Sequence, residues 1–527
     1  MDRLLLSHIL LSRVIVSVLF TLSLLGATGL LSMTRWGIGT SPDSIEYIRA
    51  ARELTSGRGW GFDQERVALT HHAPFYSFLL AAGGLAGLDP LEGARWINAA
   101  VFGLNIFLVG FVLHRSAVHA GWVPIVGSLL MMISAATLSV HVMAWTEPLF
   151  ILLSVFGFWM LAKYLRSSHS SALIISAAAI ALAFLSRYAG AAVILTGALS
   201  VLFFSRKAMP GRIRDAFFFC LVSCLPMLLW MLRNLWAAGT ATNREIFLHP
   251  IGRSHLWQAL YTLSGWFLIP QSAPNIIRFA LLLIVLTGLG LILASLFKKR
   301  PLAFGAFQFP ELPGFFGPMT LFVCVYGGFL AASLSFLDAN TPLDNRILSV
   351  VYVVGIVLTL SLVDQLWPLA KTGRATGRVV LVLVFVFSAG HLLTGLRLVQ
   401  ESYSQGWGFS SIAWQHSATL AQARKLPAGV PVFSNAPDIL YLHTGKSASP
   451  IPKKFFPANQ QRNPDFPAQL IALKQTLTRA NGVVVYFSNL KEQKSLPSEE
   501  ELKAELALCV EDRQSDGAIF RISGCPQ

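Results

Sequence analysis

Long apolar runs recur along most of the chain and set its class. From near Ile9 to about Leu396, stretches of roughly 20 apolar residues alternate with short polar segments, and about eleven such runs can be counted. A helix of that length crosses the roughly 30 Å hydrocarbon core of a bilayer. We therefore predict a polytopic α-helical membrane protein with about eleven transmembrane helices in residues 1–396.

Composition and charge placement agree with this class. Hydrophobic residues make up 54% of the chain and charged residues only 13%, which excludes an ordinary soluble protein. The net charge of +15 is concentrated in alternate loops, and short loops rich in Lys and Arg favour the cytoplasmic side. The basic loops are His114–His119, Lys163–His169, Arg206–Arg214, Lys298–Arg300 and Lys371–Arg378.

This pattern predicts a cytoplasmic N-terminus, an odd number of spans and an extracytoplasmic C-terminus in the inner (plasma) membrane. The positive charge is then explained by topology and by contact with anionic membrane lipids, and nucleic-acid binding is not expected.

After Leu396 the composition changes to that of a soluble module, residues 397–527. GVPVFSN and NGVVVYFSN have the β-branched and aromatic content of strands, and APDILYLHTG predicts a short helix that ends at Gly445. We expect a small extracytoplasmic (periplasmic) α/β domain. Its two cysteines, Cys509 and Cys525, are positioned so that a disulfide is permitted but not established.

The first outer loop, residues 32–94, carries the most informative polar segment. It contains SPDSIEYIRAARELTSGRGW and then APFYSFLLAAGGLAG, which is short for a span and suits helices at the membrane interface. Asp43 and Glu46 lie where the membrane meets water, and a carboxylate there caps a helix, pairs with a cation or serves a site. Because D-S-I-E also has the spacing of a capping box, helix capping is the competing interpretation for both acids.

Other polar residues lie at the predicted outer ends of spans, each with a simpler alternative. His72 follows His71 and has the ordinary role of an interface histidine as its alternative, and Glu147 in TEPLF also suits a helix N-terminus. Arg187 in SRYAG lies between two apolar runs, where an unpaired guanidinium is costly.

Two further outer arginines are Arg244 in TNREI and Arg346 in DNRIL. Their alternatives are local ion pairs, which contribute little: Glu245 for the first, and Asp344 or Asp338 for the second.

No motif for a soluble nucleotide or metal enzyme is present. The chain lacks CxxC and HExxH spacings, a Walker lysine motif, GxSxG, and GxGxxG after a strand. No metal site is predicted, and the sequence leaves open whether a divalent cation takes part as a cofactor.

The order of these motifs resembles a known family. The first span is followed by DSIEYIRAARELTSGRGW, APFYSFLLAA, RWINAAVFGLN, TEPLFILL and SRYAG. This order is similar to that in membrane glycosyltransferases of the GT-C fold, the group that includes protein O-mannosyltransferases and the aminoarabinose transferase that modifies lipid A. The resemblance covers roughly the first 240 residues well and is looser afterwards.

The resemblance implies transfer of a sugar from a polyprenyl-phosphate donor to a lipid, glycan or protein acceptor at the outer membrane surface, by inverting displacement. Asp43 matches the family's first-loop acid, which would act as the base, with Glu46 as the second candidate. Because the leaving group is a lipid phosphate, the outer arginines are its expected ligands. The predicted substrate-binding residues are Arg187, Arg244, Arg346, His72 and Glu147.

Two other classes of protein remain possible at this stage. A membrane transporter or flippase needs polar groups within its spans, for which Asp364 is weak support. A non-catalytic scaffold for cell-envelope glycan assembly would use the outer module for binding. The large, unequal outer loops favour the enzyme.

Overall fold

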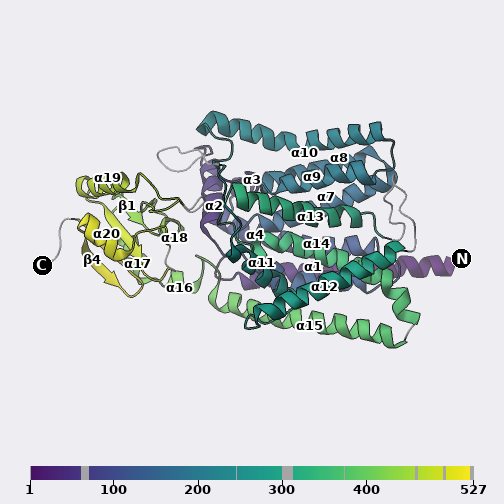
Figure 1. Cartoon of the computed structure of the whole chain (residues 1–527). Coiled ribbons are helices and arrows are strands. Elements are labelled where there is room, and N and C mark those ends of the chain that lie inside the picture. Colours follow the sequence, from purple (N-terminus) through teal and green to yellow (C-terminus); the bar gives the residue numbers. More distant parts are fainter. Residues whose placement is uncertain are drawn as a thin grey trace.

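The computed structural model describes residues 2–60, 70–244, 246–298, 312–372, 374–456, 461–490 and 494–522 (Figure 1). A bundle of helices is followed by a sheet-containing segment, which we call the outer domain. The helices that precede it are α1 (Asp2–Met33), α2 (Pro42–Thr55), α3 (Phe75–Leu85), α4 (Pro90–His114), α5 (Val123–Ile133), α6 (Ala135–His141), α7 (Glu147–Ser167), α8 (Ser170–Ser186), α9 (Gly190–Phe204), α10 (Met209–Ala238), α11 (Arg253–Gly265), α12 (Asn275–Lys298), α13 (Phe316–Phe336), α14 (Asn345–Thr372) and α15 (Arg374–Gln405).

Several of these helices are long and apolar enough to cross a membrane, which makes the chain a multi-pass membrane protein. Among the described residues there are seven such helices, or eight if the bent pair α5 and α6 forms one span. The shorter apolar helices α8 and α9, together with α12, run alongside them (Figure 1). By length and composition, seven or eight spans are therefore counted among the described residues, and the number of about eleven stays a prediction.

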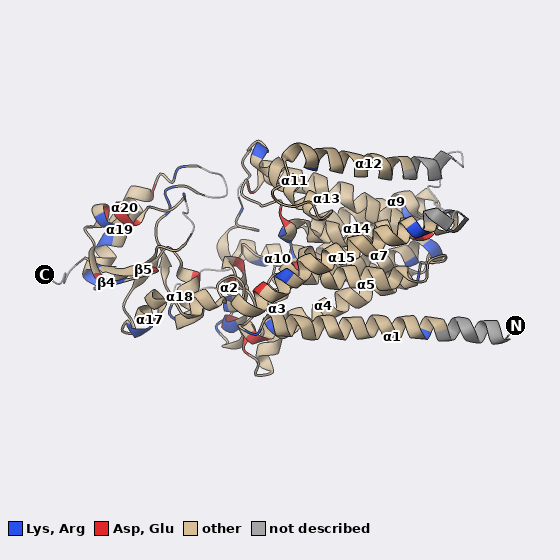
Figure 2. Cartoon of the chain, turned by 90° about the horizontal axis from the view of Figure 1, so that it is seen from below, with Lys and Arg blue, Asp and Glu red and all other residues tan. Residues whose placement is uncertain are grey.

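The two ends of the bundle differ. The N-terminal end of α1 and the outer domain lie at opposite ends (Figure 1), and charged side chains gather at both ends while the middle of the bundle is almost free of them (Figure 2). This separation follows from the cost of placing charge in hydrocarbon. The end beside the outer domain is where the predicted outer loops meet.

Helix α2, which carries both candidate acids, lies across this end of the bundle, between the bundle and the outer domain (Figure 1). Its apolar face, including Tyr47 and Ile48, packs against Tyr76 and Leu80 of α3. The prediction that Asp43 and Glu46 form its capping box is wrong. The N-cap is Ser41, whose backbone N–H donates to Ser44 Oγ at 3.1 Å, so both acids are left available for other contacts.

The outer domain contains one mixed sheet with the strand order β2-β1-β3-β5-β4. Strands β1, β2 and β3 are parallel, and β5 and β4 continue the sheet in antiparallel pairs. Its elements are α16 (Ile412–Gln415), α17 (Ala418–Lys425), β1 (Val432–Ser434), α18 (Pro437–Thr444), β2 (Ser449–Pro450), α19 (Phe466–Arg479), β3 (Val483–Phe487), α20 (Glu499–Leu506), β4 (Cys509–Gln514) and β5 (Gly517–Arg521).

The segments predicted as strands contain β1 and β3, and the predicted short helix is α18, which ends at Gly445 with φ of +69°. Cys509 begins β4, whereas Cys525, with which the sequence permits a disulfide, lies outside the described residues.

Candidate active site

A pocket of about 230 Å³ opens at the end of the bundle beside the outer domain. Its walls come from the first outer loop, the α8–α9 turn, the segment after α10, helix α13 and the loop before α14. Five of the predicted site residues line it: Asp43, His72, Arg187, Arg244 and Arg346. Side chains that are far apart in the sequence therefore share one site.

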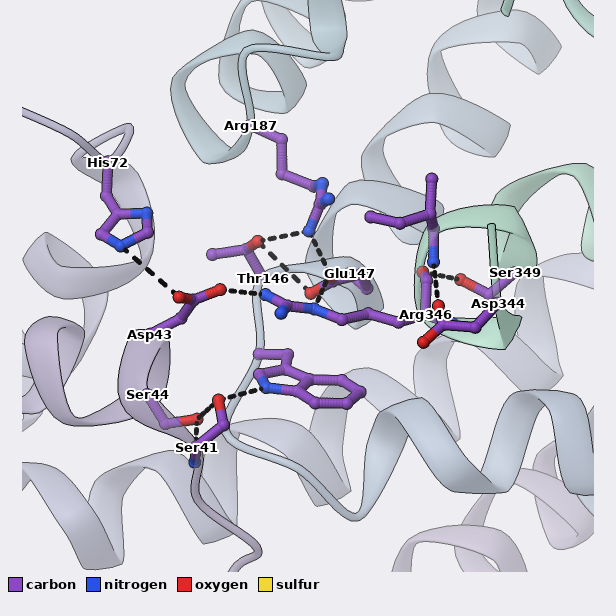
Figure 3. A network of polar contacts seen from close by, with 12 residues as sticks. Ser41, Asp43, Ser44, His72, Thr146, Glu147, Arg187, Asp344, Arg346 and Ser349 are labelled. Atoms are coloured by element: carbon purple, nitrogen blue, oxygen red, sulfur yellow. Dashed lines mark hydrogen bonds and ion pairs between the residues drawn. The ribbon is translucent and has the colours of Figure 1, made fainter. Parts of the chain in front are cut away.

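Arg346 is the centre of the polar network in this pocket (Figure 3). It is the second residue of α14, and its Nη2 lies 2.5 Å from Oδ2 of Asp43 while its Nε lies 2.7 Å from Oε1 of Glu147. The planar guanidinium can serve two carboxylates at once because its donors point in different directions. Arg346 thereby joins the start of α14 to the starts of α2 and α7.

Glu147 is the buried member of the network. Its side chain is only 3% exposed, and it also pairs with Arg187, whose Nη1 donates to Thr146 Oγ1 at 3.1 Å. Glu147 is the first residue of α7, so the helix N-terminus adds to its stabilisation. Glu147 does not line the pocket. Its contacts with Arg187 and Arg346 hold these two pocket-lining side chains in position.

Asp43 is the more accessible acid, with a side chain 34% exposed. Burial opposes its ionisation, but the charges of Arg346 and His72 outweigh that effect and hold the pKa of the Asp43 carboxyl below its usual value. Asp43 is therefore a carboxylate at neutral pH, facing the pocket.

His72 connects the two acids of α2. Its Nε2 lies 2.9 Å from Oε2 of Glu46 and 3.9 Å from Oδ1 of Asp43. The expectation that Glu46 pairs with Arg49 is not met, because Glu46 contacts His72 instead. Glu46 does not line the pocket, so its contact with the site runs through His72.

Two aromatic and hydroxyl contacts were not predicted from the sequence. The Arg346 guanidinium lies 4.5 Å from the ring centroid of Trp145, and Trp145 Nε1 donates to Ser41 Oγ at 2.8 Å (Figure 3). The Trp145 ring thus packs against the Arg346 guanidinium, and its hydrogen bond to Ser41 connects Arg346 to the N-cap of α2. The sequence signal that could have indicated these contacts is the position of Trp145, two residues before Glu147.

Arg244 differs from the other two arginines. It lines the pocket, its guanidinium lies 5.8 Å from the ring centroid of Tyr188, and its buried Nε has no hydrogen-bond partner within the described part of the chain. Glu245, its predicted local partner, lies outside the described residues. Arg244 thus presents a donor that is not used by any described carboxylate.

The local alternatives for Arg346 do not hold for its side chain. Asp344 Oδ1 accepts from the backbone N–H of Arg346 at 2.9 Å, whereas the guanidinium reaches Asp43 and Glu147. Arg187 pairs with a carboxylate, as its position between apolar runs required.

Within the described ranges, no group of three or more His, Cys, Asp or Glu side chains could hold a metal ion. No step considered below uses one.

Neither a protein-family model nor a curated protein sequence matches the chain. Solved structures do match. ArnT from Cupriavidus metallidurans in the apo state superimposes with a TM-score of 0.51 and 13% identity over 98% of this chain and 99% of ArnT. The fold is therefore shared over almost the whole of both chains. The chain has the GT-C fold.

Two further GT-C structures contain a lipid phosphate. ArnT from the same organism bound to undecaprenyl phosphate gives a TM-score of 0.50 at 13% identity over 98% of this chain and 99% of that one. The oligosaccharyltransferase AglB from Archaeoglobus fulgidus, in complex with an inhibitory peptide and a dolichol-phosphate, gives 0.50 at 12% identity over 89% of this chain and 69% of that one. At these identities the shared property is the GT-C fold, so the chemistry must be argued from this chain's own side chains.

The buried pair of Glu147 and Arg187 gives a test of the network. We expect Arg187→Gln to destabilise the folded chain by about 1.5–3 kcal/mol, because it removes one of the two arginines that contact the buried Glu147 carboxylate and leaves Arg346 in contact with it. Glu147→Gln should also destabilise, and the double variant should lose less than the sum, with a coupling of about 0.5–3 kcal/mol. Unfolding of the purified chain in detergent micelles measures this, with Arg253→Gln, an exposed arginine, as the control. Additive losses would contradict the pairing.

Proposed function

We propose that the chain transfers a sugar from a polyprenyl-phosphate donor to an acceptor at the outer face of the cytoplasmic membrane. One observation carries the proposal: an ionised Asp43 and an arginine without a described hydrogen-bond partner at Nε, Arg244, face the same pocket. The GT-C fold supports it, because ArnT and AglB with this fold have been solved with undecaprenyl phosphate and dolichol-phosphate bound.

The chemistry follows from the two kinds of group. The acceptor hydroxyl oxygen attacks the anomeric carbon from the side opposite the phosphate, and the bond from that carbon to the phosphate oxygen breaks. The electron pair leaves with the lipid phosphate, and the hydroxyl proton passes to the Asp43 carboxylate, which orients the hydroxyl beforehand. The reaction inverts the anomeric configuration and needs no other reactant.

The three arginines of the site have different roles. Arg244 supplies charge-assisted hydrogen bonds to the leaving phosphate, because its Nε has no hydrogen-bond partner among the described residues. Arg346 and Arg187 are bound to Asp43 and Glu147, so they fix the geometry of the site and add positive potential near the phosphate.

For topology we propose the arrangement that the charge pattern predicts, with about eleven spans, a cytoplasmic N-terminus and the pocket and outer domain outside. The residue that supported a transporter has a structural role. Asp364 accepts from the backbone N–H groups of Val118, His119 and Ala120 at 2.9, 2.9 and 2.7 Å, so it anchors the α4–α5 loop.

Replacing the proposed base tests the transferase function. Asp43→Asn should lower transfer by a factor of about 10²–10⁴, the usual contribution of a general base, and leave binding of undecaprenyl phosphate unchanged. The assay follows release of undecaprenyl phosphate from its glucose, mannose and arabinose derivatives in native membranes, with Glu53→Gln on the same helix as the control. Undiminished release would contradict the role of Asp43, and no release by the wild-type chain would contradict the function.

Replacing Arg244 tests the phosphate contact separately. Arg244→Gln should weaken binding of undecaprenyl phosphate by about 10- to 100-fold, because hydrogen bonds to charged groups contribute about 1.5–3 kcal/mol. Native mass spectrometry of the full chain measures the affinity, and Arg253→Gln is the matched control. An unchanged affinity would exclude Arg244 as the main ligand.

The pH dependence of transfer tests the link between Arg346 and Asp43. Because the pKa of Asp43 is lowered, the active carboxylate persists at neutral and mildly acidic pH, and activity is lost only as the pH falls through that low pKa. Arg346→Gln removes a positive charge that lowers the pKa of Asp43. The acid limb of the pH–activity profile of this variant should therefore move to higher pH. Arg244→Gln removes a charge that is not among the main ones lowering the pKa of Asp43, so it should move the limb much less. If the acid limb of Arg346→Gln lies at the same pH as that of the wild-type chain, Arg346 does not set the pKa of Asp43.

A further inference from the structure

The outer domain has the layer arrangement of a doubly wound sheet. Side chains alternate along β3, so Val483 and Val485 face the core under α17 and α18, while Val484 faces the core under α19 and α20. The helix that follows β1 therefore covers one face of the sheet, and the helix that follows β2 covers the other.

This arrangement creates a topological switch point. From the carboxyl end of β1 the chain crosses through α18 to β2, whereas from the carboxyl end of β3 it continues through α20 to β4 and β5, on the other side of β3. Because α18 and α20 cover opposite faces of the sheet, these two connections leave neighbouring parallel strands in opposite directions and open a crevice between β1 and β3. In open α/β sheets, ligands bind at such crevices.

A cavity of about 390 Å³ lies at this place. Asn435, directly after β1, and Phe487 and Ser488, at the end of β3, line it, and the segment before α20 forms the opposite wall. The Asn435 amide holds the two strand ends together: its Nδ2 donates to Phe487 O and its Oδ1 accepts from Phe487 N, both at 2.9 Å. The strand ends that line the cavity are thus fixed relative to each other.

The lining has both charge signs. Lys454 Nζ pairs with Glu501 at 2.8 and 3.1 Å, and Glu500 and Lys494 add exposed charges of opposite sign. The acidic first turn of α20 disfavours an anion, and the two lysines disfavour a cation. A neutral ligand with many hydroxyl groups can donate to the carboxylates and accept from the lysines, and the Tyr486 ring offers an apolar surface.

We propose that this crevice binds a neutral saccharide. Its place relative to the candidate active site supports a role in substrate recognition. Helix α18 starts two residues after Asn435 and packs on α2, where Arg52 Nη1 donates to the Tyr441 hydroxyl at 3.3 Å and the Arg49 guanidinium lies 4.6 Å from the Tyr441 ring centroid.

Another residue of α18 lies near the acids of α2. Burial, followed by the charge of Glu46, raises the pKa of Asp438 to about 6. One short helix therefore separates the crevice from the helix that carries Asp43. The identification of the saccharide as part of the acceptor rests on the proposed transferase function, whereas its binding does not.

Binding is measured without any donor, using the full chain in lipid nanodiscs and saturation-transfer NMR. The probes are trisaccharides of glucose, mannose and N-acetylglucosamine, with inorganic phosphate as the anionic probe. We expect at least one trisaccharide to bind, and Ser488→Trp, which places a large ring at the exposed mouth, to weaken it by about tenfold or more. Asn489→Trp, next to it but outside the lining, is the matched control.

A second pair of variants, with smaller changes in side-chain size, keeps the test valid if Ser488→Trp does not fold. Glu500→Gln should weaken saccharide binding several-fold, and Glu505→Gln, exposed on the same helix, should not change it. No trisaccharide binding, equal binding by the Ser488→Trp and Asn489→Trp variants, or phosphate binding alone would each overturn the proposal. Trisaccharide binding by a wild-type chain that releases no undecaprenyl phosphate would contradict the proposed function and leave this proposal standing, whereas release of undecaprenyl phosphate without trisaccharide binding would do the reverse.

Discussion

The two bonds of Arg346 are the constraint on which the rest of the site depends. Its guanidinium neutralises a buried acid, Glu147, and a pocket-facing acid, Asp43, and these three residues lie in the first turns of three different helices. Without Arg346 both acids would lose a cationic partner, and a carboxylate that loses such a partner in a buried site loses much of the stabilisation of its charge. The charged state of Asp43, and therefore any use of it as a base, is set by a residue 303 positions away in the chain.

Helix α2 is held from two sides, and this connects the membrane part to the outer domain. On one side Arg346, Trp145 and α3 fix its first turns, and on the other side Tyr441 of α18 contacts its arginines. Arg52 also pairs with Asp89 through two hydrogen bonds of 3.0 and 3.1 Å, which ties α2 to the start of α4. Helix α2 therefore links the outer domain to the helix starts that surround Asp43.

Much of this arrangement follows from the sequence, and the part that does not is tertiary. Alternating apolar runs place every second loop at the same end, so the gathering of Asp43, His72, Arg187, Arg244 and Arg346 at one end was predictable from periodicity and charge. The pairing of Glu147 with two arginines was not, because local spacing carries no information about contacts between distant helices. The cap of α2 was misassigned for a local reason: D-S-I-E fits the capping pattern, but Ser41 precedes Pro42, and proline favours the first helical position.

Under the proposed function, the division among the three arginines lets one pocket hold a base and a phosphate without one neutralising the other. If the phosphate took Arg346 from Asp43, the pKa of that carboxyl would rise and the base would be lost as the donor arrived. An arginine that is not paired with a described carboxylate avoids this conflict. Arg244 lines the pocket, and its Nε has no hydrogen-bond partner among the described residues. Glu147 keeps Arg346 and Arg187 in place during binding, since releasing either would leave a buried acid short of charge. The buried acid thus protects the ionisation of the accessible one.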